Sequence, residues 1–134
     1  MTYPSISSSA DDDKKLHHLL DLCQLNSWSN RLDEIQDWSR VLSLGEQQKM
    51  AFIRILYLQP KWIFLDEATA SLDEQTETVL YSILIRQLAN CPTIISVGHR
   101  NNLRQFHQIE LVLKDKSFTV TPISSENQLK TTFF

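Results

Sequence analysis

Apolar residues near the start of the chain recur at the spacing of a helix. The positions i, i+3, i+4 and i+7 are held by Leu16, Leu19, Leu20 and Cys23. This pattern is typical of an amphipathic helix, which we predict from about residue 14 to 25, with the acidic run 11–13 as its N-terminal cap. We expect residues 1–13 to be loosely ordered. Residues 26–42 are predicted to be a polar connection, and its candidate core anchors are Trp28, Leu32, Ile35 and Trp38.

A second helix is predicted to begin at Ser43. Ser43 and Glu46 fit the sequence S-x-x-E. This is the capping box, in which a hydroxyl and a carboxylate satisfy N–H groups that the first turn of a helix leaves without partners. The helix is expected to continue to about Leu58 and to end before Pro60.

Short apolar runs alternate with a helical pattern in the middle of the chain. Residues 62–66 and 93–97 are predicted to be buried strands of a parallel sheet. The helix between them is expected from about residue 74 to 89. Its predicted buried residues are Val79, Leu80, Ile83, Leu84 and Leu88. Strands that alternate with helices predict an α/β fold with a mostly parallel central sheet.

The last part of the chain is predicted to hold a short helical piece and a hairpin. The helical piece is expected near residues 101–106. Weak alternation at 109–113 and 117–121 predicts two strands with a turn at 114–116. The polar tail after Ile123 is expected to be frayed.

Composition narrows the classes of protein that the chain can represent. The 134 residues, 42% of them apolar and 22% charged, are ordinary for one globular domain. A net charge of −3 without a long Lys/Arg run argues against a nucleic-acid partner. Cys23 and Cys91 fit no metal or disulfide spacing, so we expect reduced thiols. No segment approaches the roughly 18 apolar residues of a membrane span, and no signal region is visible, which predicts a soluble, cytoplasmic chain.

Residues 42–48 form a candidate anion site. Their sequence is L-S-L-G-E-Q-Q. It puts the Ser43 hydroxyl and the bare Gly45 N–H at the positive end of a helix, and Gly45 allows a phosphate to approach without a Cβ in its way. The alternative is an ordinary capping box, and this segment alone does not decide between the two.

A pair of carboxylates follows the first predicted strand. Asp66 and Glu67 end the run W-I-F-L-D-E, at the carboxyl edge of the predicted sheet, where ligands bind in open α/β folds. An oxygen ligand there suits Mg²⁺, and an adjacent carboxylate can polarise a water molecule. The alternative is a solvated acidic pair.

The order and spacing of these segments resemble the nucleotide-binding domain of ATP-binding cassette (ABC) transporters. Residues 42–48 resemble the signature motif, W-I-F-L-D-E resembles Walker B, and A-T-A-S-L-D, which ends at Asp73, resembles the D-loop. Leu44 stands where the family usually has glycine. His99, in S-V-G-H-R, is similar to the switch histidine. His17, His18 and His107 match nothing in the family and are expected to be surface residues.

The resemblance implies a role for each matched residue. Ser43 and Gly45, with Glu46 and Gln47 beside them, would contact the nucleotide held by the opposite subunit of a head-to-tail dimer, and Asp73 would link the subunits. Asp66 would bind Mg²⁺, commonly through water. Glu67 would polarise the attacking water, and His99 would contact the γ-phosphate of ATP. The implied cofactors are therefore ATP and Mg²⁺.

The family's glycine-rich P-loop is missing from the sequence. That loop has the form G-x-x-x-x-G-K-[ST]. The chain has two glycines, Gly45 and Gly98, and the positions of a second loop glycine hold Met50 and Leu103. We therefore expect a partial P-loop NTPase fold: residues of about 1–58 as helical subdomain and signature helix, and about 59–134 as the C-terminal part of the core. The isolated chain is expected neither to bind ATP tightly nor to hydrolyse it, so its standing as an enzyme stays open.

Two segments resemble one branch of the family. Residues 37–41, D-W-S-R-V, and 96–100, S-V-G-H-R, are similar to peroxisomal fatty-acyl transporters and bacterial fused permease–ATPase proteins. Such proteins carry a transmembrane permease domain ahead of the cassette, which implies a permease partner and a place at the cytoplasmic face of a membrane. The alternatives are a non-catalytic truncated remnant or interaction module and, more weakly, a cytoplasmic ABC protein without a transporter.

Overall fold

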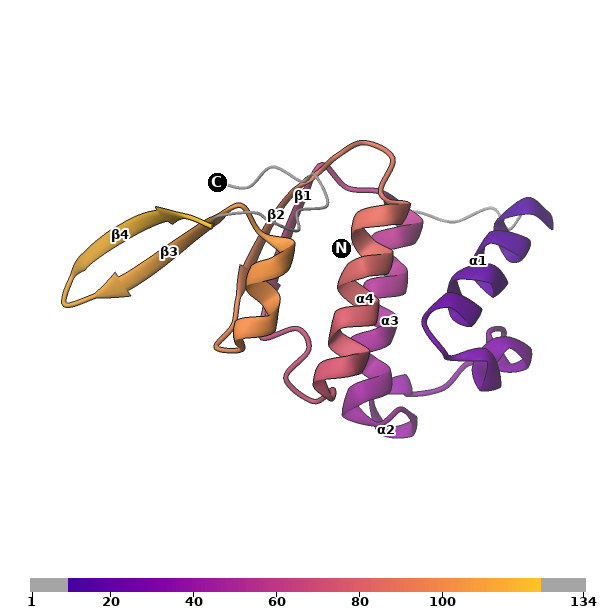
Figure 1. Ribbon diagram of the computed structural model, residues 1–134. Coiled ribbons are helices and arrows are strands. Elements are labelled where there is room, and N and C mark those ends of the chain that lie inside the picture. The colour runs from indigo at the N-terminus through magenta and orange to yellow at the C-terminus, as the bar shows by residue number, and fades with distance from the viewer. Residues whose placement is uncertain (1–9, 124–134) are drawn as a thin grey trace.

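The computed structural model describes residues 10–123 of the chain (Figure 1). Its helices are α1 (Ala10–Leu22), α2 (Trp38–Val41), α3 (Leu44–Leu58) and α4 (Glu74–Gln87), with 3₁₀ turns η1 (Asn26–Arg31) and η2 (Asn101–Phe106). Its strands are β1 (Trp62–Asp66), β2 (Thr93–Val97), β3 (Ile109–Lys114) and β4 (Ser117–Pro122). The predicted α/β class is confirmed.

The helices form one layer beside the strand pair β1–β2. Helix α1 packs on α3, α3 packs on α4, and α4 packs on η2. Figure 1 shows α3 and α4 side by side, with α1 outside them and the hairpin β3–β4 projecting away at the opposite end. Within residues 10–123, no helix is long and apolar enough to cross a membrane.

The strands form two small sheets. Strands β1 and β2 pair in parallel, with Trp62 opposite Thr93 and Asp66 opposite Val97, so the predicted parallel sheet is confirmed at the size of two strands. Strands β3 and β4 form a separate antiparallel hairpin. Its turn residues Asp115 and Lys116 both have positive φ, as tight hairpin turns require.

Burial alternates along β1, and in β2 only Ile94 is buried, so the prediction that both strands are buried is wrong. Ile63, Leu65 and Ile94 are buried, whereas the side chains between them in β1 are exposed, Trp62 at 57% and Phe64 at 71%. Successive side chains of a strand point to opposite faces, and the helices cover one face only. We call the exposed face, made by residues 62, 64 and 66 of β1 and 93, 95 and 97 of β2, the bare face.

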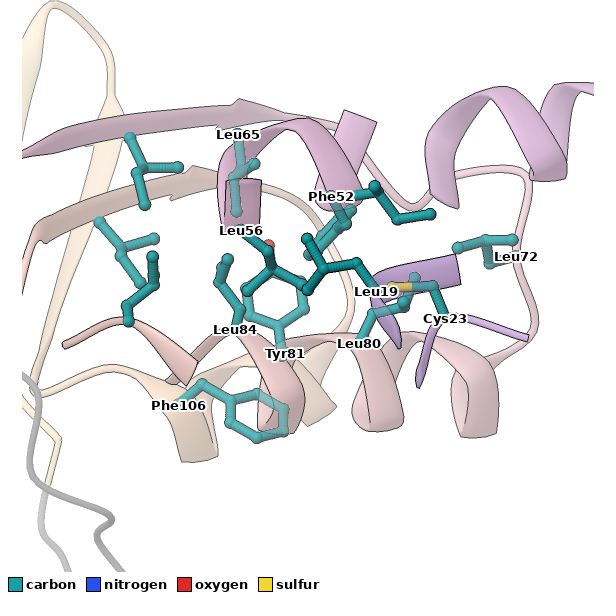
Figure 2. Close-up of a cluster of buried hydrophobic side chains, with 14 of the residues drawn as sticks. Leu19, Cys23, Phe52, Leu56, Leu65, Leu72, Leu80, Tyr81, Leu84 and Phe106 are labelled. Atoms are coloured by element: carbon teal, nitrogen blue, oxygen red, sulfur yellow. The ribbon is translucent and has the colours of Figure 1, made fainter. Parts of the chain in front are cut away.

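The buried face of the strand pair belongs to a single apolar core. Figure 2 shows Tyr81 of α4 in the middle of this core. The Tyr81 ring lies edge-on to Phe52 of α3, with centroids 5.7 Å apart, and stacks on Phe106 of η2 at 5.3 Å. The turn after α1 adds Cys23, whose burial raises the pKa of the thiol to about 11. Cys23 and the exposed Cys91 are both free thiols, as expected.

The predicted helices occur with shifted ends. Helix α1 begins at Ala10, so the acidic residues 11–13 lie inside its first turn, where they still favour the positive end of the helix. Helix α4 ends at Gln87, two residues before the predicted end. The expectation of loose order is therefore wrong for residues 10–13, which belong to α1, whereas residues 1–9 and the tail after Ile123 lie outside the described residues.

Some of the individual burial predictions fail. Val79 is exposed on α4, because it lies off the stripe that faces the core, whereas Leu80, Leu84 and Leu88 are buried as predicted. In the connection 26–42, Trp28 and Leu32 pack against the core. Ile35 is fully exposed and anchors nothing.

Candidate functional site

The predicted capping box at the start of α3 is confirmed. Ser43 is the N-cap: its Oγ accepts from the N–H of Glu46 at 3.3 Å, and the Ser43 N–H donates to Glu46 Oε2 at 2.9 Å. The Ser43 hydroxyl also donates to Glu46 Oε2 at 2.7 Å. The hydroxyl proton predicted to meet a phosphate is therefore held by a carboxylate in this structure.

A third donor reaches Glu46 from η1. Trp28 Nε1 donates to Glu46 Oε1 at 2.9 Å. The hydrogen bonds from the Ser43 side chain, then from Trp28, lower the pKa of Glu46, so its carboxylate stays charged at the positive end of α3. Sequence reasoning missed this role of Trp28, because nothing in the local pattern relates residues so far apart along the chain.

The remaining signature residues hold neighbouring loops. The amide of Gln47 donates to the carbonyls of Ser39 at 3.0 Å and Leu42 at 2.9 Å. At Gly45, a Cβ would lie 3.1 Å from Leu72 Cδ2, tighter than ordinary contact, so the loop after β1 packs on the start of α3. The segments predicted to be the signature motif and the D-loop therefore touch.

Asp66 and Glu67 lie at the carboxyl end of β1, as the strand pattern predicts. Asp66 is exposed at the end of the bare face. Glu67 has φ 44°, a left-handed conformation that is unusual for a residue other than glycine, and its N–H donates to the Val97 carbonyl at 3.0 Å. Backbone strain of this kind clusters at functional sites and needs support from its surroundings.

The structure brings His99 to Glu67. The His99 Nδ1 atom lies 3.9 Å from Glu67 Oε1, and both side chains are largely exposed. The two residues line one small cavity together with Gly98 and Arg100, among others. Asp66 directly precedes Glu67 in the sequence but does not line this cavity.

Asp73 caps helix α4. Its Oδ1 accepts from the Thr76 N–H at 2.9 Å, and its Oδ2 accepts from the Thr76 hydroxyl at 2.7 Å. The hydrogen bond from the Thr76 side chain, then that from its backbone, lowers the pKa of Asp73.

A buried carboxylate on α4 was missed in the sequence. Glu77 is 1% exposed and contacts Thr69, Asn102 and Arg100. A signal was present, because Glu77 falls on the helical stripe with Leu80, Tyr81 and Leu84, where a charge needs a partner.

Known proteins with similar sequences identify the family of this chain. The model of the family described as "ABC transporter" matches residues 4–70. This chain belongs to the ABC transporter family. An uncharacterized ABC transporter ATP-binding protein of Haemophilus influenzae is 43% identical over 116 residues, which are 87% of this chain and 19% of the relative. The human lysosomal cobalamin transporter ABCD4 is 46% identical over 115 residues, 83% of this chain and 18% of the relative.

A plant protein belongs to the same set of relatives. The chloroplastic ABC transporter D family member 2 of Arabidopsis thaliana is 48% identical over 95 residues, 71% of this chain and 12% of the relative. These D family and bacterial relatives agree with the branch predicted from residues 37–41 and 96–100. The ABC chain spans about a fifth or less of the length of the relatives it matches. It has a partial P-loop NTPase fold.

One histidine of this ABC chain is more buried than the sequence predicts. His107 is half-buried: its Nδ1 is 2.9 Å from the Leu103 carbonyl, and its ring centroid is 6.1 Å from that of Tyr81. Burial lowers its pKa. The surface prediction for His107 is wrong, because η2 turns the chain back onto α4. His17 and His18 are exposed, as predicted.

Proposed function

We propose that this chain carries the hydrolytic part of an ABC transporter ATPase domain, in which ATP binding and hydrolysis drive membrane transport. The observation that carries the proposal is the approach of His99 Nδ1 to Glu67 Oε1 at 3.9 Å beside one cavity. Two groups suited to holding water and phosphate thus come from loops after two different strands. Ligands bind at this edge of parallel sheets.

Glu67 and His99 take complementary roles in the proposal. Glu67 polarises the attacking water, and His99 contacts the γ-phosphate. A general base has to lie within hydrogen-bond reach of the proton it takes, and both exposed side chains can reach a molecule in the cavity. Phosphoryl transfer depends mainly on positioning and electrostatics, so the position of Glu67 matters as well as its charge.

Asp66 is the proposed Mg²⁺ ligand. Among residues 10–123, no group of three or more His, Cys, Asp or Glu side chains is arranged to hold a metal ion. Mg²⁺ usually binds one or two carboxylates and completes its shell with phosphates and water, so the proposal asks only one carboxylate of this chain. Bound there, Mg²⁺ would neutralise charge on the phosphates.

The start of α3 is proposed to serve the nucleotide of a second ATPase domain in a head-to-tail dimer. Ser43 and Gly45 would face its γ-phosphate. Glu46, Gln47 and Asp73 would shape that contact through the bonds that they already make. Because Glu46 holds the Ser43 proton, the hydroxyl has to turn from the carboxylate to the phosphate when nucleotide arrives.

The proposal extends to the architecture of the whole protein. Residues of about 1–58 would belong to the helical subdomain and signature helix, and about 59–134 to the core with Walker B, D-loop and switch histidine. The partner would be a transmembrane permease domain, which places the ATPase at the cytoplasmic face of a membrane.

A chimera tests the proposed activity. Residues 10–123 would replace the aligned segment of the full-length Haemophilus influenzae relative, which is 43% identical to this chain. We expect Mg²⁺-dependent ATP hydrolysis that falls by about 10²–10⁴-fold in Glu67→Gln. The matched control is Glu74→Gln, a nearby exposed glutamate outside the cavity. A chimera in which Glu67→Gln and Glu74→Gln hydrolyse ATP equally would contradict the role of Glu67.

A second candidate is an interaction module without turnover. The observation behind it is the exposed apolar residues of the bare face, which suit a binding surface. A folded chimera that binds ATP and assembles, but does not hydrolyse ATP, would support this candidate.

A further inference from the structure

The buried carboxylate of Glu77 has a set of partners that joins two loops. Its Oε1 accepts from the Thr69 hydroxyl, and its Oε2 accepts from Asn102 Nδ2 at 2.7 Å. Arg100 Nη1 lies 3.6 Å from the same Oε2. A buried charge is stable only when it is paired and hydrogen-bonded, so these contacts hold Thr69, Arg100 and Asn102 to one point on α4.

The partners of Glu77 lie within three residues of the proposed catalytic pair in the sequence. Thr69 is in the loop that begins at Glu67, and Arg100 directly follows His99. Glu77 itself is buried and lines the same cavity as Glu67 and His99. The Glu77 side chain therefore attaches both loops to α4.

Arg100 adds a second bond between the loops. Its Nη1 donates to the Leu72 carbonyl at 2.8 Å, and its Nη2 donates to the Ala70 carbonyl at 3.3 Å. The planar, forked guanidinium can bind two carbonyls and a carboxylate at once, which a lysine cannot do with the same geometry. Arg100 lies in the loop after β2 and thereby holds the loop after β1 in place.

We propose that Glu77 and Arg100 form a clamp that sets the separation of Glu67 and His99. This inference rests on the proposed function, because Glu67 and His99 are the residues of the proposed ATP site. Glu77 and Arg100 are positioning residues, because they act through the loops that they hold. A general stabilising role is the competing account, and it predicts effects spread over the whole fold.

The test is amide hydrogen exchange of the 134-residue chain without nucleotide. In Glu77→Met combined with Arg100→Met, apolar side chains of similar length replace the pair. Replacing a buried ion pair by apolar side chains is often neutral, but the Thr69 hydroxyl and the Asn102 amide also lose their acceptor, so the midpoint of global unfolding should fall only modestly. The amides of Glu67, Ala70 and Leu72, which bond to Val97, Glu67 and Thr69, should exchange faster by on the order of tenfold.

A matched control pair comes from the surface of the same region. Arg104 and Glu110 form an exposed ion pair at 2.7 Å between η2 and β3. Arg104→Met combined with Glu110→Met should leave exchange at residues 67–72 unchanged. Unchanged exchange at 67–72 in the Glu77/Arg100 double variant would overturn the clamp, and so would faster exchange spread equally over α3 and α4.

A milder variant covers the case in which the double variant fails to fold. Arg100→Lys keeps a cation beside Glu77 but cannot bind both carbonyls, so exchange at Ala70 and Leu72 should still rise. No rise there would overturn the clamp. Because no nucleotide is present, the exchange result is independent of the chimera: an inactive chimera with clamped loops would reject the proposed function and keep the clamp.

Discussion

The two faces of the strand pair β1–β2 carry similar side chains and have opposite surroundings. Ile63 and Leu65 are buried under α3 and α4, whereas Trp62 and Phe64, which alternate with them, are exposed. All four residues are apolar, so the sequence gives both faces the composition of a core. Exposed apolar patches mark interaction surfaces, so the bare face is a candidate contact surface.

The bare face continues into a cleft beside the hairpin. The cleft, of about 680 Å³, lies between β2 and the strands β3 and β4. Its apolar lining includes Ile95, Val97, Leu111, Leu113 and Val120. A parallel sheet is normally covered on both faces. The bare face and the cleft are thus the part of the fold that differs most from an α/β domain whose sheet is covered on both faces.

The largest difference between the two faces should appear in alanine variants of neighbouring residues. Leu65→Ala removes a buried side chain and should lower the free energy of unfolding by about 2–5 kcal/mol. Phe64→Ala removes a larger but exposed side chain and should change it little. Urea unfolding followed by circular dichroism measures both. Equal losses in the two variants would mean that the bare face is covered in solution.

Self-association is the second expected consequence of the bare face. The purified chain should be oligomeric or poorly soluble, because apolar side chains and strand edges are both exposed. Phe64→Lys should shift it toward monomer in sedimentation velocity, whereas Val79→Lys, an exposed site on α4, should not. A monomeric parent chain with a sharp, cooperative unfolding transition would show that the chain closes its own core.

Smaller effects are expected at the start of α3, in the helical layer that covers the other face of the strand pair. Ser43→Ala should lower the free energy of unfolding by about 0.5–2 kcal/mol through loss of the cap. Ser43→Asn caps about as well, so stability should recover. ATP-driven association of the chain with a piece that carries the P-loop should still fall sharply in Ser43→Asn. If Ser43→Asn associates as well as the parent chain does, the segment is only a helix cap.

The smallest expected effect is a pH dependence from His107, at the border of core and cleft. Burial lowers its pKa below the ordinary value of 6.5, so the unfolded chain binds this proton more readily than the folded chain. Stability contributed by neutral His107 is therefore complete above about pH 6.5 and declines as pH falls below that value. His107→Phe should flatten this decline in urea unfolding at pH 7.5 and 5.5. The exposed His17→Phe should leave it in place.

Local patterns predicted the longer helices and the strands but not η1 and α2, and distant contacts were not predictable from them. The S-x-x-E box and the apolar run before Asp66 report short-range chemistry, so both appear at the expected residues. A continuous apolar strand looks the same whether one face or two are covered, so the bare face stayed hidden. The bond from Trp28 to Glu46 and the partners of Glu77 join segments far apart in the chain, and periodicity holds no information about them.

The central claim is that this chain holds the carboxylate and histidine part of an ATP site and lacks the phosphate-binding loop. Its most direct test is ATP binding and hydrolysis by the isolated chain with Mg²⁺. Without P-loop amides and lysine, most phosphate contacts are missing, so we predict neither tight binding nor measurable hydrolysis. Magnesium-dependent hydrolysis by the isolated chain that disappears in Glu67→Gln would contradict the claim.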